Sequence, residues 1–169
     1  MEILGMEIKF ENGDRYSGNV AGDIPHGKGT YYFVTGDRYE GEWKNGKMCG
    51  RGTLFFADGG RHEGEWQDNI RQGRGVHFST DGGRHEGFWK DDRAQGRGVC
   101  RYGGEAIGEY YDGEWKDDER HGKGTYYFSD GSRFEGMWVG GERHGKGKLF
   151  NEKGKVIKRG TWHNGECSK

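Results

Sequence analysis

Long hydrophobic runs are missing from this sequence, and proline and cysteine are scarce, with one proline and three cysteines in 169 residues. No stretch approaches the roughly 20 apolar residues that a transmembrane helix needs. Cys49, Cys100 and Cys167 lie far apart, are odd in number and form no C-x-x-C pair, which argues against a disulfide framework and against a zinc knuckle. We therefore expect a reducing, cytoplasmic setting and no metal.

An excess of charge of either sign is also absent. The chain has 27 basic and 28 acidic residues, so its formal net charge is -1. Such a balance supplies no bulk field that would draw the chain onto nucleic acid or an anionic membrane. We expect no nucleic-acid partner, and membrane contact is not favoured.

Apolar residues are few, yet aromatic residues are abundant. The 36 glycines and 33% charged residues resemble a chain that is unable to bury a core. The aromatic content of 14% opposes that interpretation, because aromatic side chains bury a large area each. We expect a thin core that is mainly aromatic.

These aromatic residues follow an internal repeat, whose marker glycine recurs in steps of 23, 23, 23, 26, 23 and 24 residues. The marker glycines are Gly18, Gly41, Gly64, Gly87, Gly113, Gly136 and a partial Gly160. Two residues later stand all the tryptophans of the chain, Trp43, Trp66, Trp89, Trp115, Trp138 and Trp162, with Val20 in the first copy. A period of this size predicts an array of stacked units, so we assign these glycines and tryptophans a structural role.

The repeat predicts a single array over residues 1–169. A half repeat occupies residues 1–15, full repeats start near residues 16, 39, 62, 85, 111 and 134, and a partial repeat covers 158–166. Because the array begins and ends inside a hairpin, its unpaired strand edges allow end-to-end homodimers or the addition of a partner strand. Short charged termini that merely blunt these edges are an equal alternative.

Two strands are expected in each repeat. In the copy that starts at Tyr39, residues 39–43 alternate uncharged and acidic side chains, which is the pattern of a half-buried strand. Residues 50–56 are rich in β-branched and aromatic side chains and predict a second strand. Both connections are short, so the sequence predicts an all-β antiparallel meander of stacked hairpins with almost no helix.

The turn between copies decides which side chains share a face. Asp58-Gly59 and its counterparts are typical of type I′ turns, in which both central residues have positive φ. A two-residue turn places Phe55 opposite His62 and Arg51 opposite Trp66, which gathers the bulky positions, Phe55 included, on one face as the core. A three-residue turn would shift the register by one and exchange the faces of the second strand. We also expect the tryptophan to lie flat across a glycine that has no Cβ.

The repeat resembles a known family. The run Tyr39-Glu40-Gly41-Glu42-Trp43, with His121-Gly122-Lys123-Gly124-Thr125-Tyr126 and the closing Asp130-Gly131 in a later copy, is similar to the MORN repeat (membrane occupation and recognition nexus). The resemblance implies an elongated, twisted or curved sheet that serves as a scaffold, often in flagellar axonemes, basal bodies or the cortical cytoskeleton. Some members carry a joined enzyme, but none is joined here, so we expect a cytoskeletal or ciliary scaffold of the MORN-only type.

One departure from the repeat interrupts the fourth copy. Residues 103–108 replace the usual Asp-Gly turn and add three residues. We expect this loop to protrude, and loops on a rigid scaffold often carry contacts. The candidate contact residues are Gly104, Glu105, Ala106 and Ile107.

Candidate chemistry is weak throughout. The Gly-Lys-Gly segments precede strands and lack the Lys-Ser/Thr of nucleotide loops, so no nucleotide or other cofactor is expected. The recurring acids face a ladder of basic residues, Lys28, Arg51, Arg74, Arg97, Lys123 and Lys146, which favours cross-strand ion pairs or stacking of these cations on tryptophan over acid/base catalysis. We expect no catalytic residue and no enzyme.

Two functional interpretations are kept. In the first, the chain is a protein-binding scaffold whose aromatic sheet face receives an extended or helical partner segment. The candidate partner-binding residues are Tyr32, Phe55, Phe78, Arg101, Tyr127 and Phe150. In the second, a phospholipid-binding module tethers a complex to a membrane through the basic ladder and a row of arginines, Arg15, Arg38, Arg61, Arg84 and Arg133.

Overall fold

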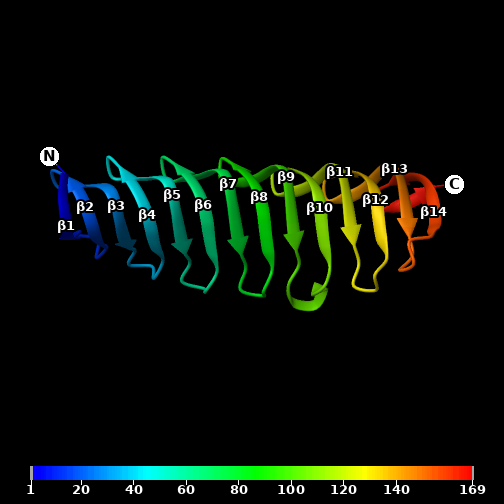
Figure 1. Ribbon diagram of the computed structural model, residues 1–169, viewed down its shortest axis with the longest axis horizontal. Helices are drawn as coiled ribbons and strands as arrows, with labels where there is room; N and C mark the ends of the chain where they lie inside the picture. Colours follow the sequence, from blue (N-terminus) through cyan, green and yellow to red (C-terminus); the bar gives the residue numbers. More distant parts are fainter. Residues whose placement is uncertain (1, 169) are drawn as a thin grey trace. The chain divides into compact units, whose positions relative to one another are not determined.

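The computed structural model describes residues 2–168, and side chains are described from Gly5 to Ser168. The strands follow one another along the chain in a single antiparallel sheet with the order β1 to β15, which confirms the predicted all-β meander (Figure 1). The one helical element among these residues is the short 3₁₀ turn η1 (Gly104–Ala106). The strands are β1 (Glu2–Lys9), β2 (Arg15–Ala21), β3 (Ile24–Tyr32), β4 (Arg38–Lys44), β5 (Lys47–Phe55), β6 (Arg61–Gln67), β7 (Ile70–Phe78), β8 (Arg84–Lys90), β9 (Arg93–Arg101), β10 (Tyr110–Lys116), β11 (Glu119–Tyr127), β12 (Arg133–Val139), β13 (Glu142–Phe150), β14 (Val156–His163) and β15 (Glu166–Ser168).

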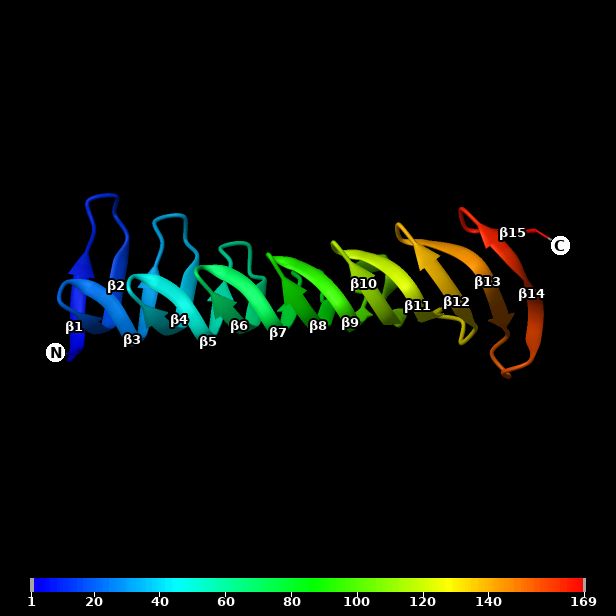
Figure 2. The same ribbon diagram turned by 90° about the horizontal axis from the view of Figure 1, so that it is seen from above.

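The chain divides into two compact units, which are treated separately below. Unit 1 is Met1–Thr80 and contains β1 to β7, and unit 2 is Asp81–Lys169 and contains β8 to β15. Within each unit, consecutive strands lie side by side in both views (Figures 1 and 2). Each unit is therefore a short stack of the same hairpin.

The turns inside a repeat are the tight ones. Between β4 and β5 the two central residues, Asn45 and Gly46, have φ of 53° and 77°. Positive φ at both positions is the signature of a type I′ turn, which suits asparagine, aspartate and glycine. Type I′ geometry therefore occurs inside the repeat, and not at the Asp-Gly turns where the sequence suggested it.

The turns between repeats are one residue longer than expected. After β5, the Phe56 N–H donates to the Gly60 carbonyl at 2.9 Å, and the Gly59 N–H donates to the Phe56 carbonyl at 3.0 Å. These bonds enclose the three residues 57–59, of which Gly59 alone has a positive φ, 99°. This is the three-residue loop in which glycine takes the left-handed position.

The longer turn shifts the register, so the predicted core face is wrong. Phe55 lies opposite Arg61, and Trp66 lies opposite Gly50 where the two-residue turn placed Arg51. Because side chains alternate, the shift by one residue moves the second-strand aromatics to the opposite face. We call the side that carries Tyr39, Trp43 and their repeats the Trp face, and the side that carries Phe55 and its repeats the polar face.

The core of unit 1 is a ladder of aromatic rings on the Trp face. The ring of Trp43 meets those of Tyr16 and Tyr39 edge to face, at centroid separations of 5.5 and 5.2 Å. Tyr39 then meets Trp66, in the next copy, at 5.4 Å. Each ring is thus shared by two neighbouring copies, as a repeat that cannot bury its core alone requires.

Glycine pairs make room for the tyrosine of this ladder. Gly41 and Gly52 pair across β4 and β5, and a Cβ on either would lie closer than 3.0 Å to the Tyr39 ring or hydroxyl. The tyrosine, and not the tryptophan as expected, therefore lies over the paired glycines. The Trp43 indole N–H instead donates to the Gly29 carbonyl at 3.1 Å, in the preceding copy.

A bulge beside each glycine pair explains the tyrosine hydroxyl. The register of β4 and β5 shifts between Gly41 and Glu42, which interrupts the backbone ladder. The Tyr39 hydroxyl lies within 3.4 Å of the Glu42 and Cys49 carbonyls, and the Glu42 carboxylate accepts the Arg51 N–H at 3.0 Å. Side chains thus bind the groups that the bulge leaves unpaired, as buried polar groups require.

Unit 2 repeats this construction with different rings. Tyr111 meets both Trp115 and Trp138 at 5.2 Å, and Phe134 meets Trp138 at 5.4 Å and Trp162 at 4.9 Å. The Tyr111 hydroxyl donates toward the carbonyls of the bulge, at 3.1 and 3.3 Å. Phe134 is equally buried but has no hydroxyl for this purpose.

Candidate functional site

In each unit, the three candidate partner-binding residues lie at one edge of the polar face. Each is the last residue of its strand, in β3, β5, β7, β9, β11 and β13. The residue opposite is the first residue of the preceding strand, as in the pairs Arg38 with Phe55 and Arg133 with Phe150. We call these paired positions the arginine–aromatic row.

In unit 1 the row consists of arginines that lie on aromatic rings. The guanidinium carbon is 4.3 Å from the ring centroid for Arg38 on Phe55, and 3.7 Å for Arg61 on Phe78. Arg38 also pairs with Glu40 at 2.9 Å. A ring on one side and a carboxylate on the other hold the cation in place, which pre-orders the surface. The first member is Arg15 on Tyr32, at 4.8 Å.

In unit 2 the row is less regular. Arg133 lies 4.0 Å from the Phe150 ring centroid and pairs with Glu135 at 2.8 Å, as in unit 1. Tyr127 instead stacks on Tyr110, with the ring centroids 4.1 Å apart and the planes 11° apart. Arg101, which stands where other copies have an aromatic ring, lies 4.9 Å from the Tyr110 ring. The sequence did not single out Tyr110 as part of this surface.

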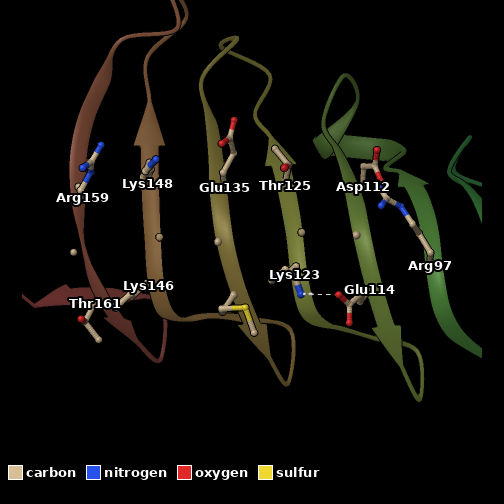
Figure 3. A pocket seen from close by; sticks show the side chains of 16 residues that line it. Arg97, Asp112, Glu114, Lys123, Thr125, Glu135, Lys146, Lys148, Arg159 and Thr161 are labelled. Atoms are coloured by element: carbon tan, nitrogen blue, oxygen red, sulfur yellow. Dashed lines mark hydrogen bonds and ion pairs between the residues drawn. The ribbon is translucent and has the colours of Figure 1, made fainter.

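Next to the row, unit 2 has a groove on the polar face with a volume of about 1110 Å³. Its floor is a line of glycines that continues from strand to strand, and polar side chains rise on both sides of that line (Figure 3). A Cβ on Gly113 or Gly124 would point to the Trp face, toward the Tyr111 ring, so the groove lies between the two rows of side chains on the polar face. The floor glycines are Gly113, Gly124, Gly136, Gly147 and Gly160.

The charges along the groove change from one end to the other. Near β10, Asp112 pairs with Arg97 at 3.0 Å and the Glu114 carboxylate accepts the Lys123 N–H at 3.3 Å. Near β13 and β14 the side chains are mainly basic, and Met137 takes a position that is glutamate in three other copies. The cations at this end are Lys146, Lys148 and Arg159. Of the basic ladder, Arg97 therefore makes the expected cross-strand ion pair.

The Trp face of unit 2 has a smaller pocket of about 610 Å³, lined by several aromatic rings and by Arg120. The Arg120 guanidinium lies 4.6 Å from the Trp138 ring centroid and 5.1 Å from that of Tyr126. Burial raises the pKa of the Cys100 thiol in this pocket to about 11. A thiol with so high a pKa stays protonated near neutrality, so it is not an activated nucleophile.

The insertion in the fourth copy forms the turn η1, between β9 and β10 (Figure 1). The Gly104 N–H donates to the Asp81 carbonyl at 3.0 Å, which ties the loop to the preceding turn. Ile107 is 75% exposed, more than any other large apolar side chain described. The loop therefore presents one apolar side chain to solvent from an anchored backbone.

Among the described residues, no group of three or more histidine, cysteine, aspartate or glutamate side chains could hold a metal ion. In the same part of the chain, no helix has the length and apolar character needed to cross a membrane.

Comparison with protein families decides the relationship. The model of the MORN repeat matches residues 16–38, 39–61, 62–84, 85–104, 111–133 and 134–155. This chain belongs to the MORN-repeat family. The matched segments begin at the residues at which the sequence predicted the repeats to start, and the fourth stops at the insertion. No curated protein matches the MORN-repeat chain as a whole.

Solved structures show the fold alone. The TCP domain of Drosophila melanogaster SAS-4 (dCPAP), solved in complex with a proline-rich motif of Ana2 (dSTIL), is 14% identical, with a TM-score of 0.57. The match covers 96% of this chain and 89% of that one. The TCP10 domain of Danio rerio CPAP is 15% identical over 93% of this chain and all of that one, but its TM-score of 0.26 carries no structural argument.

Proposed function

We propose that this MORN-repeat protein is a non-enzymatic scaffold that binds an extended segment of a partner protein on its polar face. The observation that carries the proposal is the arginine–aromatic row, in which a ring and a carboxylate hold Arg38 and Arg61 before any partner arrives. Pre-ordered arginine and aromatic side chains are the usual anchors of protein interfaces, because little side-chain entropy is lost on binding. The row in either unit offers such anchors at a regular spacing.

The related TCP fold supports the kind of partner. SAS-4 is described in complex with a proline-rich motif, which is an extended ligand. Extended segments of this type suit surfaces of aromatic rings, because they lose little conformational freedom on docking. We place the scaffold in cytoskeletal, axonemal or basal-body assemblies, which is the setting that the resemblance to other MORN-repeat proteins implies.

Two observations favour a binding role over catalysis. The carboxylates of the row are engaged by arginines, as in the pair of Arg61 and Glu63 at 2.6 Å, so they are poor candidates for a general base. The buried Cys100 thiol has a raised pKa. Neither group is prepared for acid/base or nucleophilic chemistry.

A crosslinking pulldown from cell extract tests the proposal. The baits are the intact chain and the double variant Phe55→Ala/Phe78→Ala, in which the row of unit 1 loses two rings. The matched control is Val34→Ala/Ile70→Ala, which shortens two exposed apolar side chains of the same unit outside the row. Circular dichroism and thermal unfolding verify that all three baits are folded.

A defined partner that the row variant loses and the control keeps is the expected result. Identical partners for all three baits would overturn the placement on the row of unit 1 and direct attention to the insertion or to the Trp-face pocket. The phospholipid alternative has its own outcome: salt-sensitive co-sedimentation with anionic vesicles, without any protein partner, would replace the scaffold proposal. The ion pairs of Arg38 and Arg61 count against that outcome, because paired cations attract lipid headgroups weakly.

A further inference from the structure

The last hairpins of unit 2 break the charge pattern of the repeat. In three other copies a threonine on the second strand faces a glutamate on the next strand, as Thr125 faces Glu135, and in the fourth copy Val99 faces Asp112. At the same place in β13 and β14, Lys148 faces Arg159. Like charges directly opposite each other in a sheet destabilise it, so the fold gains nothing from this pair. On its other side Lys148 lies opposite Glu135 of β12, whose carboxylate pairs with Arg133 at 2.8 Å.

The neighbouring position has lost its acid as well. In unit 1 the basic ladder faces glutamates across the strands, as Arg51 faces Glu65. In unit 2, Lys146 faces the uncharged Thr161. Within the described part of the chain, Lys146, Lys148 and Arg159 make no ion pair with a carboxylate. Arg97 and Arg133, in contrast, each make such an ion pair, at 3.0 and 2.8 Å.

These three cations surround one end of the glycine-floored groove. Lys148 and Arg159 rise on one side of the line of glycines, and Lys146 and Thr161 rise on the other (Figure 3). All three basic side chains are exposed and can meet a ligand in solution. Exposed cations that make no ion pair among the described residues, two of which face each other, are suited to an anionic ligand.

We propose that this end of the groove binds an acidic, extended peptide segment of a partner protein. The inference rests on the proposed function in placing the partner on the polar face, but it uses charges of unit 2 and not the aromatic rings of unit 1. The groove continues over β9 to β14, which at about 4.8 Å per strand is on the order of 24 Å, or about seven residues of extended chain. This elongated form fits a chain with several carboxylates better than a single compact anion.

The direction of the segment follows from the charges of the groove. Its carboxylates lie over Lys146, Lys148 and Arg159, where the glycine floor lets the backbone approach closely. The other end of the groove carries Asp112 and Glu114, which repel acids and favour a neutral or basic residue there. The partner segment is therefore acidic at one end only, which fixes its orientation.

Fluorescence anisotropy with a labelled octapeptide tests the proposal. In one half of the probe, glutamate alternates with serine, so that an extended chain directs these carboxylates to one side, and the other half is uncharged. The neutral control probe has glutamine in place of glutamate. At low salt we expect the intact chain to bind the acidic probe at least tenfold more tightly than the neutral one, and higher salt to weaken this binding.

The variant Lys148→Thr/Arg159→Glu introduces the residues that other copies carry at these positions, so the fold should be kept. We expect it to bind the acidic probe at least tenfold more weakly, with a melting temperature equal to or above that of the intact chain. The matched control Lys153→Thr/Lys155→Glu makes the same change in net charge in the loop between β13 and β14, and it should bind as the intact chain does.

Equal affinity of the groove variant and the intact chain would overturn the proposal, and so would equal affinity for the two probes. Binding to anionic vesicles but not to the acidic probe would also overturn it, by identifying a lipid headgroup as the anion. The variant Phe55→Ala/Phe78→Ala should keep full affinity for the probe. If the pulldown gives the expected result and the acidic probe does not bind, the scaffold proposal is supported and the present inference is overturned. If the acidic probe binds as expected and the pulldown does not give the expected result, the present inference is supported and the placement of the partner on the row of unit 1 is overturned.

Discussion

Units 1 and 2 build the same hairpin on nearly the same Trp face, but their polar faces differ. In unit 1, acids such as Glu42 and Glu65 alternate regularly with basic residues across the strands. In unit 2, Glu114 keeps the acid, but the other corresponding positions hold Phe88, Met137 and Thr161, and the fourth copy carries the insertion. The strand pairing tolerates all these changes. The Trp face and the glycine pairs therefore specify the fold, and the polar face is free to vary with function.

The units also differ in the ring that lies over the paired glycines. Unit 1 uses Tyr16, Tyr39 and His62, whereas unit 2 uses His85, Tyr111 and Phe134. Burial raises the pKa of Tyr16 to about 12, as expected for a hydroxyl that stays protonated and donates to a carbonyl. The position requires a flat ring, and the hydroxyl adds stability without being indispensable.

The largest effect expected is from filling a glycine pair. In Gly52→Ala of unit 1 the new Cβ would lie closer than 3.0 Å to the Tyr39 ring, so we expect a loss of about 3 kcal/mol in the free energy of unfolding. In Gly98→Ala of unit 2 the nearest atom is the His85 Nε2 at 3.0 Å, and we expect a loss of about 1 kcal/mol. Urea unfolding, with hydrogen exchange to assign the loss to a unit, measures both. Equal losses of stability in the two variants would show that the ring over the glycine pair does not determine the size of the loss.

The second comparison exchanges the hydroxyl between copies. Tyr111→Phe removes hydrogen bonds to two carbonyls and should cost about 1–2 kcal/mol. Phe134→Tyr should add about 1 kcal/mol, because the same bulge occurs beside Phe134 and its carbonyls would gain a donor. Thermal unfolding of the two variants decides the matter. If Phe134→Tyr destabilises the protein, the bulge between β12 and β13 differs from the bulges of the other copies.

A third effect depends on pH and concerns unit 1. Burial lowers the pKa of His77, which stands where Leu54 and Tyr31 stand in other copies. The unfolded chain then binds the proton more readily, so stability is full above the ordinary histidine pKa of about 6.5 and falls as the pH drops below it. We expect a loss of about 1 kcal/mol between pH 7 and 5.5, measured by urea unfolding. His77→Leu should remove this part of the pH dependence, and an unchanged profile would assign it to another group.

The smallest effect is expected on the polar face. Arg61→Ala in unit 1 and Arg133→Ala in unit 2 each remove one exposed ion pair and one ring contact, for about 0.5–1 kcal/mol. Thermal unfolding should show similar small shifts in both units. A loss of several kcal/mol in either would mean that the row holds the sheet together, and would weaken the argument that it is kept for a partner.

Much of the fold could be read from the sequence, but the face could not. The repeat starts, the two strands per copy and the antiparallel order all follow from the periodic glycines and tryptophans, and the family match and strand order agree. The register was wrong because Asp58-Gly59 is compatible with both a two-residue and a three-residue turn. The choice between them depends on a ring packing over two glycines that lie on different strands, as Tyr39 does over Gly41 and Gly52.

The candidate site was found in part. The row residues Phe55 and Phe150 were singled out from their place in the repeat, but the arginines lying on them were not assigned to them. Lys148 and Arg159 were missed as a pair, because they are departures from the repeat that become neighbours only when β13 and β14 pair. A comparison of every copy with the others at these positions would have flagged both.

By itself, the sequence determined the unit, the number of copies and the antiparallel meander, because these depend on local alternation and on short connections. Only the tertiary structure decided which side chains share a face, because a shift of one residue in the register reverses every side chain of a strand. It also decided where the groove lies, since the polar-face side chains that border it come from successive strands of unit 2.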